Sequence, residues 1–241
     1  MIYLRKANDR GHANRDWLDS WHTFSFASYQ DLNFMGFSTL RVINEDIIKP
    51  GTGFGQHPHE DMEILTYVLQ GTVEHKDSMG NIEKIPAGEF QIMSAGSGVT
   101  HSEYNASNEI PLHLYQIWIE PNVLGIKPRY EQKKFDDIQG QQFILTPDGR
   151  DGSLKVFQDT VLSRWVLSKD EKPEITLDKE RRYWIQVVKG TIEVNGKKAT
   201  TSDAFAIHGE EKLNIVSQED SEILFFDLPP SKQGKGPMWS K

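Results

Sequence analysis

The stretch GTGFGQHPH at residues 51–59 places two histidines, His57 and His59, two positions apart. In a β-strand, side chains at that spacing project from the same face with their Cα atoms about 7 Å apart, so both imidazoles can converge on one ion. On a helix the same spacing directs the rings apart. The stretch therefore predicts a strand that carries a candidate metal site. While the pair stands alone, a polar loop around Pro58 is the plainer alternative.

A second pair with the same spacing, His101 and Glu103, ends the stretch AGSGVTHSE at residues 95–103. The glycine-rich turn before the pair is typical of a chain that bends to aim a strand inward. Two pairs are stronger evidence than one. Because the chain contains no cysteine, a metal site would use nitrogen and oxygen ligands. Three imidazoles and one carboxylate suit divalent Fe, Mn, Co, Ni, Cu or Zn and leave coordination positions open for a substrate or oxygen.

Short strands surround both pairs, and this pattern indicates an all-β fold. Segments rich in β-branched and aromatic residues alternate with Gly, Pro, Asn and Asp, and helical periodicity is weak. YVLQGTVE at residues 67–74 resembles VVKGTIEV at 187–194, which hints at an internal duplication. The polar stretch 128–140 is expected to connect two domains. Strands are predicted at residues 37–43, 63–69, 72–76, 91–94, 112–119, 142–145, 154–157, 165–167, 183–188, 191–194, 205–207, 213–216 and 223–226.

The composition argues against several classes of protein. Hydrophobic residues make up 37% of the 241 residues and charged residues 26%, a profile typical of a soluble globular protein. The net charge is −8 and Lys and Arg form no cluster, so we expect no nucleic-acid partner. No run approaches the roughly 18 apolar residues of a membrane helix, and the N-terminal segment is too polar for a secretory signal. We therefore expect a cytoplasmic protein with no membrane partner.

The two motifs resemble those of the cupin superfamily. Residues 51–63 followed by Gly71 are similar to the first cupin motif, and residues 98–105 are similar to the second. In detail, HPHEDMEI at 57–64, AGSGVTHSE at 95–103, WHTFSF at 21–26 and LRVIN at 40–44 are similar to the pirin family, especially to its bacterial quercetin 2,3-dioxygenases. The resemblance covers residues 1–229. Gly96 stands where proline is usual in cupins, a departure that the pirin branch shares.

The resemblance implies two cupin barrels, double-stranded β-helices of the jelly-roll type, packed face to face with few short helices. One divalent metal ion would be bound in the first barrel by His57, His59, His101 and Glu103. We expect iron, with Cu, Co, Ni, Mn and Zn as alternatives. Glu63, the acidic residue of the first cupin motif, is expected to be a structural neighbour of the site and not a ligand.

The domain organisation follows from the same resemblance. Residues 1–135 are expected to form the N-terminal domain with the metal site. Residues 136–241 are expected to form a C-terminal domain without metal, because His208 is the single histidine there. The tail from about residue 230 has the composition of a flexible terminus. We expect a monomer.

The activity that the resemblance implies is an oxidoreductase reaction, in which the heterocyclic ring of quercetin-like flavonols is cleaved with O2 and carbon monoxide is released. A flavonol or related enol would bind at the metal through its 3-hydroxyl group. Glu103 would be both a ligand and the catalytic group that accepts or shares the hydroxyl proton.

Two other interpretations stand beside the enzyme. The first is a non-enzymatic, metal-dependent, redox-sensing transcriptional co-regulator of the pirin type. The second is a structural protein of two cupin barrels with an incidental metal. A cavity that admits a planar ligand to the metal would favour the enzyme, whereas a sealed metal would favour the co-regulator.

The remaining histidines and the N-terminal aromatic residues are expected to be structural. His22 and His75 have no partner at ligand spacing, and His113 lies in an apolar strand where a core histidine is the expected role. Aromatic residues are frequent between residues 17 and 29. We expect them to fasten the N-terminal segment to the core and not to line a ligand entrance.

Overall fold

The computed structural model describes residues 1–230, so most of the tail expected from about residue 230 lies outside the described residues. Within residues 1–230 the regular structure consists of strands β1 to β22 and two short 3-10 helices, Ala7–Asp9 and Arg150–Gly152. The predicted all-β fold with few short helices is therefore confirmed. None of the helices among these residues has the length and apolar character that a membrane crossing requires.

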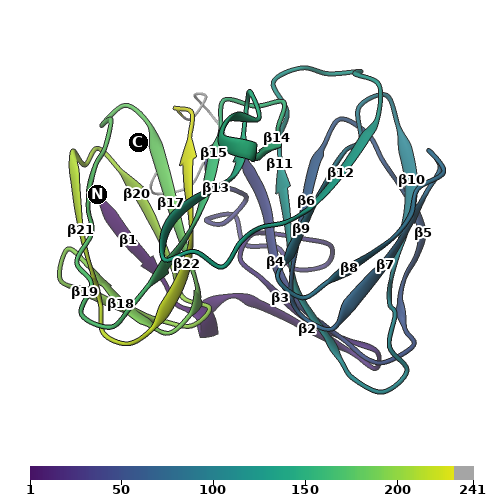
Figure 1. Ribbon diagram of the computed structural model, residues 1–241, viewed down its shortest axis with the longest axis horizontal. Helices are drawn as coiled ribbons and strands as arrows, with labels where there is room; N and C mark the ends of the chain where they lie inside the picture. The colour runs from purple at the N-terminus through teal and green to yellow at the C-terminus, as the bar shows by residue number, and fades with distance from the viewer. Residues whose placement is uncertain (231–241) are drawn as a thin grey trace.

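The first barrel is built from two antiparallel sheets that face one another (Figure 1). Its strands are β2 (Gly11–Arg15), β3 (Leu18–His22), β4 (Leu40–Ile48), β5 (Gly53–His59), β6 (Glu63–Gln70), β7 (Thr72–Asp77), β8 (Ile82–Pro86), β9 (Glu89–Ser94), β10 (Val99–Asn105), β11 (Leu112–Ile119) and β12 (Arg129–Lys134). The larger sheet has the order β12-β9-β6-β11-β4-β3-β2, and the smaller sheet has the order β5-β10-β7-β8.

The second barrel repeats this plan, as the predicted duplication requires. Its strands are β1 (Ile2–Arg5), β13 (Gly140–Thr146), β14 (Leu154–Lys155), β15 (Val161–Leu167), β16 (Glu174–Thr176), β17 (Arg182–Lys189), β18 (Thr191–Val194), β19 (Lys197–Thr200), β20 (Ala204–His208), β21 (Lys212–Ser217) and β22 (Ser221–Leu228). The larger sheet has the order β1-β20-β17-β22-β15-β13-β14, and the smaller one has the order β16-β21-β18-β19.

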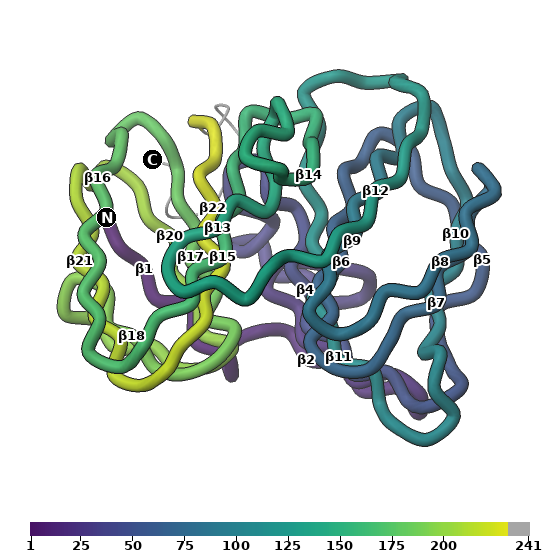
Figure 2. The backbone as a smooth tube through the Cα atoms, in the orientation of Figure 1, coloured from purple at the N-terminus to yellow at the C-terminus, as the bar shows by residue number. Residues whose placement is uncertain are grey.

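The first strand of the chain lies in the second barrel. β1 pairs with β20, with Ile2 opposite Ile207, and Figure 2 shows the chain passing from there into the first barrel. Its apolar side chains, Ile2 and Leu4, pack against the core of the second barrel, which explains the position. The N-terminal segment was expected to belong wholly to the first domain, and β1 departs from that expectation. The domain boundary near residue 135 stays a prediction.

The polar stretch 128–140 is only in part a connection. β12 lies within it and pairs with β9 at the edge of the larger sheet, so residues 135–139 are left between the barrels. An edge strand has one neighbour and faces solvent, so charged side chains such as Lys133 and Lys134 suit it. From the sequence alone, such a strand is predicted as a linker because it contains few apolar residues.

A shared apolar core joins the two barrels, which confirms the predicted face-to-face packing. Strand β6 is buried on both faces: Ile64 and Val68 point into the first barrel, and Leu65 and Tyr67 belong to the shared core. Trp184 of the second barrel is fully buried in the shared core. Aromatic rings of the first barrel, such as Phe24 at 5.1 Å between ring centroids, contact it.

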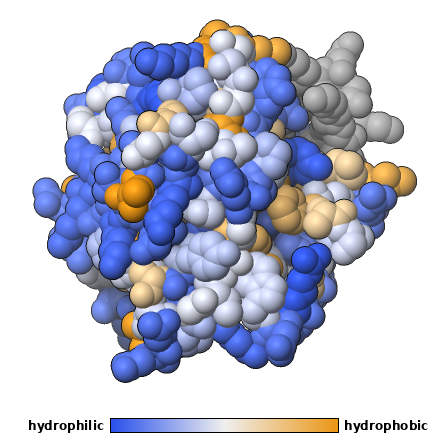
Figure 3. All heavy atoms as spheres, turned by 90° about the vertical axis from the view of Figure 1, so that its right-hand side faces the viewer, coloured by the Kyte–Doolittle hydropathy of each residue, from blue (hydrophilic) through white to orange (hydrophobic). Residues whose placement is uncertain are grey.

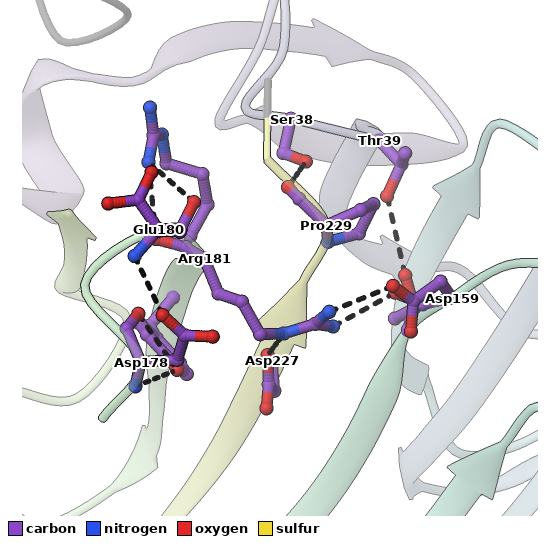
Figure 4. Close-up of polar contacts among 11 residues, drawn as sticks. Ser38, Thr39, Asp159, Asp178, Glu180, Arg181, Asp227 and Pro229 are labelled. Atoms are coloured by element: carbon purple, nitrogen blue, oxygen red, sulfur yellow. Dashed lines mark hydrogen bonds and ion pairs between the residues drawn. The ribbon is translucent and has the colours of Figure 1, made fainter. Parts of the chain in front are cut away.

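Polar contacts also join the barrels at one edge of this core (Figure 4). The Ser38 hydroxyl donates to the carbonyl oxygen of Pro229 over 2.6 Å, and the Thr39 and Thr160 hydroxyls lie 3.4 Å apart. Nearby, Arg181 holds Asp159 at 2.8 Å and also pairs with Asp227. The end of β22 is thereby fixed against the first barrel.

Candidate metal and substrate site

Three predicted ligands form one group on the smaller sheet of the first barrel. His57 and His59 lie on β5, and His101 lies on β10 directly opposite His57. The ring centroids are 4.5 Å apart for His57 and His101, and 4.9 Å apart for each of the other two pairs. One nitrogen of each ring lies within 4.8 Å of the others. The two-residue spacing of His57 and His59 therefore brings their rings together, as predicted for a strand.

The fourth predicted ligand, Glu103, lies in an adjoining group with His75 and His101. Glu103 and His75 are direct neighbours across the β10–β7 ladder, and their ligand atoms also lie within 4.8 Å of each other and of His101. His101 belongs to both groups and connects them. His75 was expected to be structural. Its place here depends on the pairing of β7 with β10, which no local spacing in the sequence reveals.

The imidazoles of His59 and His101 are in the neutral form that binds metal ions. Burial, together with the neighbouring imidazoles, lowers the pKa of His59 to about 4 and that of His101 to about 3. His57 donates from Nδ1 to the carbonyl oxygen of Gly55 over 2.8 Å, which leaves Nε2 for an ion.

His101 provides the clearest sign that the group fits a metal. It is 1% exposed, and neither ring nitrogen has a hydrogen-bond partner among the described residues. Buried polar atoms are rarely left unpaired. A divalent ion among the three imidazoles would satisfy one of these nitrogens.

Three side chains hold the Glu103 carboxylate. Gln91 donates to Oε1 over 2.8 Å, Gln116 donates to Oε2 over 2.7 Å, and the Thr66 hydroxyl lies 3.2 Å from Oε1. Glu103 is 2% exposed, so these hydrogen bonds replace water. The carboxylate therefore has a fixed orientation beside His101.

The residues that hold Glu103 belong to a row of polar side chains across the larger sheet. At each step from β3 to β9, one polar residue stands opposite another in the ladder. This row, which we call the polar row, consists of His22, Asn44, Gln116, Thr66 and Gln91.

A cavity of about 220 Å³ lies between the polar row and the histidines. It reaches His57, His59 and Glu103 on one side. Its apolar walls include Leu18, Phe26, Phe54 and Trp118, and its polar walls include Ser20, His22, Asn44, Asp46 and Gln116. The Phe26 and Trp118 rings meet edge to face at 5.5 Å, and Trp118 also contacts the His59 ring at 5.0 Å. The metal group is therefore open to a small molecule.

The other residues considered from the sequence have separate places. Glu63 lies outside both groups of candidate ligands and accepts a hydrogen bond from Ser94 over 2.9 Å, in keeping with a structural role. His113 pairs with Glu45 at 3.0 Å. The N-terminal aromatic residues divide between two roles, since Phe24 lies in the shared core whereas Phe26 lines the cavity.

The sequence matches known families over both halves. A family model described as Pirin matches residues 4–119, and one described as Quercetinase C-terminal cupin domain matches residues 143–228. A quercetin 2,3-dioxygenase of Escherichia coli (strain K12) is 67% identical over 230 residues, which cover 95% of this chain and 100% of that protein. A pirin-like protein of Caulobacter vibrioides is 40% identical over 231 residues, or 94% of this chain and 99% of that protein.

Solved structures match along the same length. The crystal structure of YhhW from Escherichia coli has a TM-score of 0.94 at 67% identity and covers 95% of this chain and 98% of that one. The bacterial pirin YhhW in complex with nickel(II) has a TM-score of 0.93 at 66% identity, over 95% and 100% of the two chains. GK1651 from Geobacillus kaustophilus shares the fold at 20% identity, with a TM-score of 0.78 over 95% of each chain.

Proposed function

This chain belongs to the pirin family, and on that basis we propose that it is a metal-dependent dioxygenase that cleaves the heterocyclic ring of quercetin-like flavonols with O2 and releases carbon monoxide. The observation that carries the proposal is the cavity that opens onto His57, His59 and Glu103. An oxygenase must admit a planar ligand to its metal, and a cavity lined by apolar residues beside three of the proposed ligands supports that role. The quercetin 2,3-dioxygenase of Escherichia coli, at 67% identity, supports the same reaction.

The proposed ligands of a single divalent transition metal ion are His57, His59, His101 and Glu103. The nickel(II) complex of a relative at 66% identity supports such an ion. Iron is the metal that we propose, with Ni, Co, Cu, Mn and Zn as alternatives. When bound, the ion would supply a Lewis acid for an enol oxygen and the redox chemistry for reaction with O2.

The side chains have three tasks in this reaction. Phe26, Phe54 and Trp118 contact the flat faces and edges of the substrate and exclude water from it. Glu103 accepts or shares the proton of the reacting hydroxyl group. Gln116, which donates to Glu103, keeps the carboxylate directed while the proton moves.

The alternatives receive less support from the site. A co-regulator needs a binding surface and no cavity at its metal. In Figure 3, the face that carries the smaller sheet of the first barrel is mostly hydrophilic, with separate hydrophobic residues. Among the described residues, both nitrogens of buried His101 lack a partner, which is costly without an ion and therefore favours a site built to hold a metal over an incidental one. We further propose that the partners are a flavonol or related enol and O2, and that the protein acts in the cytoplasm as a monomer without nucleic acid or membrane.

The test is anaerobic loading of the purified protein with each of the six metals, followed by quercetin turnover with detection of carbon monoxide. We expect metal-dependent carbon monoxide release that is lost in His101→Ala. His208→Ala, in the second barrel, is the matched control and should retain both metal and turnover. Tight metal binding without turnover under any loading would refute the dioxygenase proposal.

A further inference from the structure

The cavity has a second polar wall, on the sheet that faces the histidines. Ser20 and His22 lie on β3, and Asp46 and Asn44 lie opposite them on β4. Because strand side chains alternate, both pairs point to the same side of the sheet, and all four line the cavity. Their exposed fractions are 2%, 5%, 3% and 3%, in the order Ser20, His22, Asn44, Asp46.

Hydrogen bonds within this wall leave two acceptor atoms unused. The Ser20 hydroxyl donates to Oδ1 of Asp46, and His22 donates from Nδ1 to Oδ1 of Asn44 over 2.9 Å. Among the described residues, no hydrogen bond involves Oδ2 of Asp46 or Nε2 of His22. Because Nδ1 carries the proton of the neutral ring, Nε2 is an acceptor. Both free groups therefore suit a ligand that donates hydrogen bonds, such as a hydroxyl group.

The charges of the wall agree with this assignment. Burial lowers the pKa of His22, which keeps its ring neutral. Burial also raises the pKa of Asp46 to about 7, with Glu103 as a further negative neighbour. Above that pH the carboxyl group is ionised, and its Oδ2 then accepts a hydrogen bond from a hydroxyl group of the ligand.

We propose that Asp46 and His22, supported by Ser20 and Asn44, form a second polar subsite that binds a hydroxyl group of the substrate while another oxygen of the same molecule lies at the histidine group. The inference rests on the proposed function and narrows its substrate class. The substrate is a planar aromatic molecule with oxygen atoms at two separate edges, and Asp46 is a positioning residue.

The size of the cavity supports simultaneous contact with both walls. At about 220 Å³ it is smaller than the roughly 300–1,000 Å³ of most ligand pockets. An aromatic ring system in contact with Phe54 and Trp118 would therefore fill it, and polar substituents on two edges would meet the two walls. A molecule with an oxygen on only one edge would leave Oδ2 of Asp46 and Nε2 of His22 without a partner.

The test compares two probes under anaerobic conditions by isothermal titration calorimetry with the nickel(II)-loaded protein. 3-Hydroxyflavone carries one hydroxyl group, and quercetin carries further hydroxyl groups on other edges. At a pH above the pKa of Asp46, we expect the unmodified protein to bind quercetin about tenfold more tightly than 3-hydroxyflavone, the worth of one hydrogen bond to a charged group. Asp46→Asn and Asp46→Ala should lose this preference and keep their affinity for 3-hydroxyflavone.

The matched control is Asp19→Asn, on the exposed side of β3 beside Ser20, which should keep the preference for quercetin. Equal binding of the two probes by the unmodified protein would overturn the subsite, whether or not the Asp46 variants fold. So would a preference that persists in folded Asp46→Ala, or an equal loss of both affinities. Carbon monoxide release by the unmodified protein is measured separately. A preference without turnover would thus refute the proposed reaction while leaving the subsite in place.

Discussion

Gln116 donates a hydrogen bond from Nε2 to Oε2 of Glu103 over 2.7 Å, and this bond crosses from the larger sheet of the first barrel to the smaller one. The polar row thereby reaches the candidate metal ligands. Asn44 stands next to Gln116 in the same row and lines the substrate cavity. The row thus connects the residues expected to hold the metal with those expected to hold the substrate.

Gln116→Leu should weaken metal binding by about 10- to 100-fold, because residues that orient a metal ligand contribute that much to affinity. In this variant the Glu103 carboxylate would lose the hydrogen bond to Oε2 and would no longer be held in one orientation. Metal affinity is measured by competition with a chelator. Gln132→Leu, the same change on the edge strand β12, is the control and should leave the metal affinity unaltered. An unchanged affinity in Gln116→Leu would remove Glu103 from the proposed ligand set or Gln116 from its support.

His75→Ala should lower metal affinity about tenfold, less than the loss caused by His101→Ala. His75 lies beside both His101 and Glu103, and it donates to Asp77 over 3.0 Å, which fixes its ring. Metal content after dialysis against a chelator series gives the ranking. If His75→Ala binds the metal as tightly as the unmodified protein, His75 plays no part in metal binding.

The pair of Glu45 and Arg10 predicts a pH dependence of stability. Although burial favours the protonated form of Glu45, hydrogen bonds from His113 and Arg10 and the charge of Arg10 lower its pKa to about 2. A folded-state pKa below that of the unfolded chain stabilises the protein above about pH 4.5, and this stabilisation is lost as the pH falls toward 2. At pH 7 the free energy of unfolding should therefore be higher than that of Glu45→Gln by at most about 3 kcal/mol.

Urea unfolding of the two proteins between pH 7 and pH 3 measures this difference. The gap in free energy of unfolding should narrow as the pH is lowered. A constant gap over the whole range would show that the carboxylate charge of Glu45 does not stabilise the fold.

Phe24→Ala should reduce the free energy of unfolding by about 3–5 kcal/mol, the usual effect of removing a buried phenyl ring. Phe24 is 1% exposed and contacts Trp184 of the other barrel. Leu32→Ala is the control, because Leu32 is 83% exposed and its loss should cost less than about 0.5 kcal/mol. Similar unfolding curves for the two variants would mean that the barrels gain little stability from each other.

The sequence predicted those features that depend on neighbours along the chain. His57 and His59 lie on one face of one strand, so their spacing was sufficient, and most strands of the barrel walls carried a clear apolar pattern. The second polar wall was not predicted, because Ser20 and Asp46 meet only through the pairing of β3 with β4. His75 was missed for the same reason. Strand register between distant segments has no signature in local spacing.

The pairing of β1 with β20 has a consequence for the order in which the chain acquires its structure. Ile2 leaves the ribosome long before its partner Ile207, because the strands of the first barrel lie between them in the sequence. β1 must therefore wait for the second barrel before it can complete its ladder, and contacts between residues so far apart in the sequence form slowly. β1 is thus translated ahead of the first barrel but completes its pairing only with the second. A nascent chain stalled after the first barrel would carry β1 as an unpaired apolar strand that chaperones can recognise.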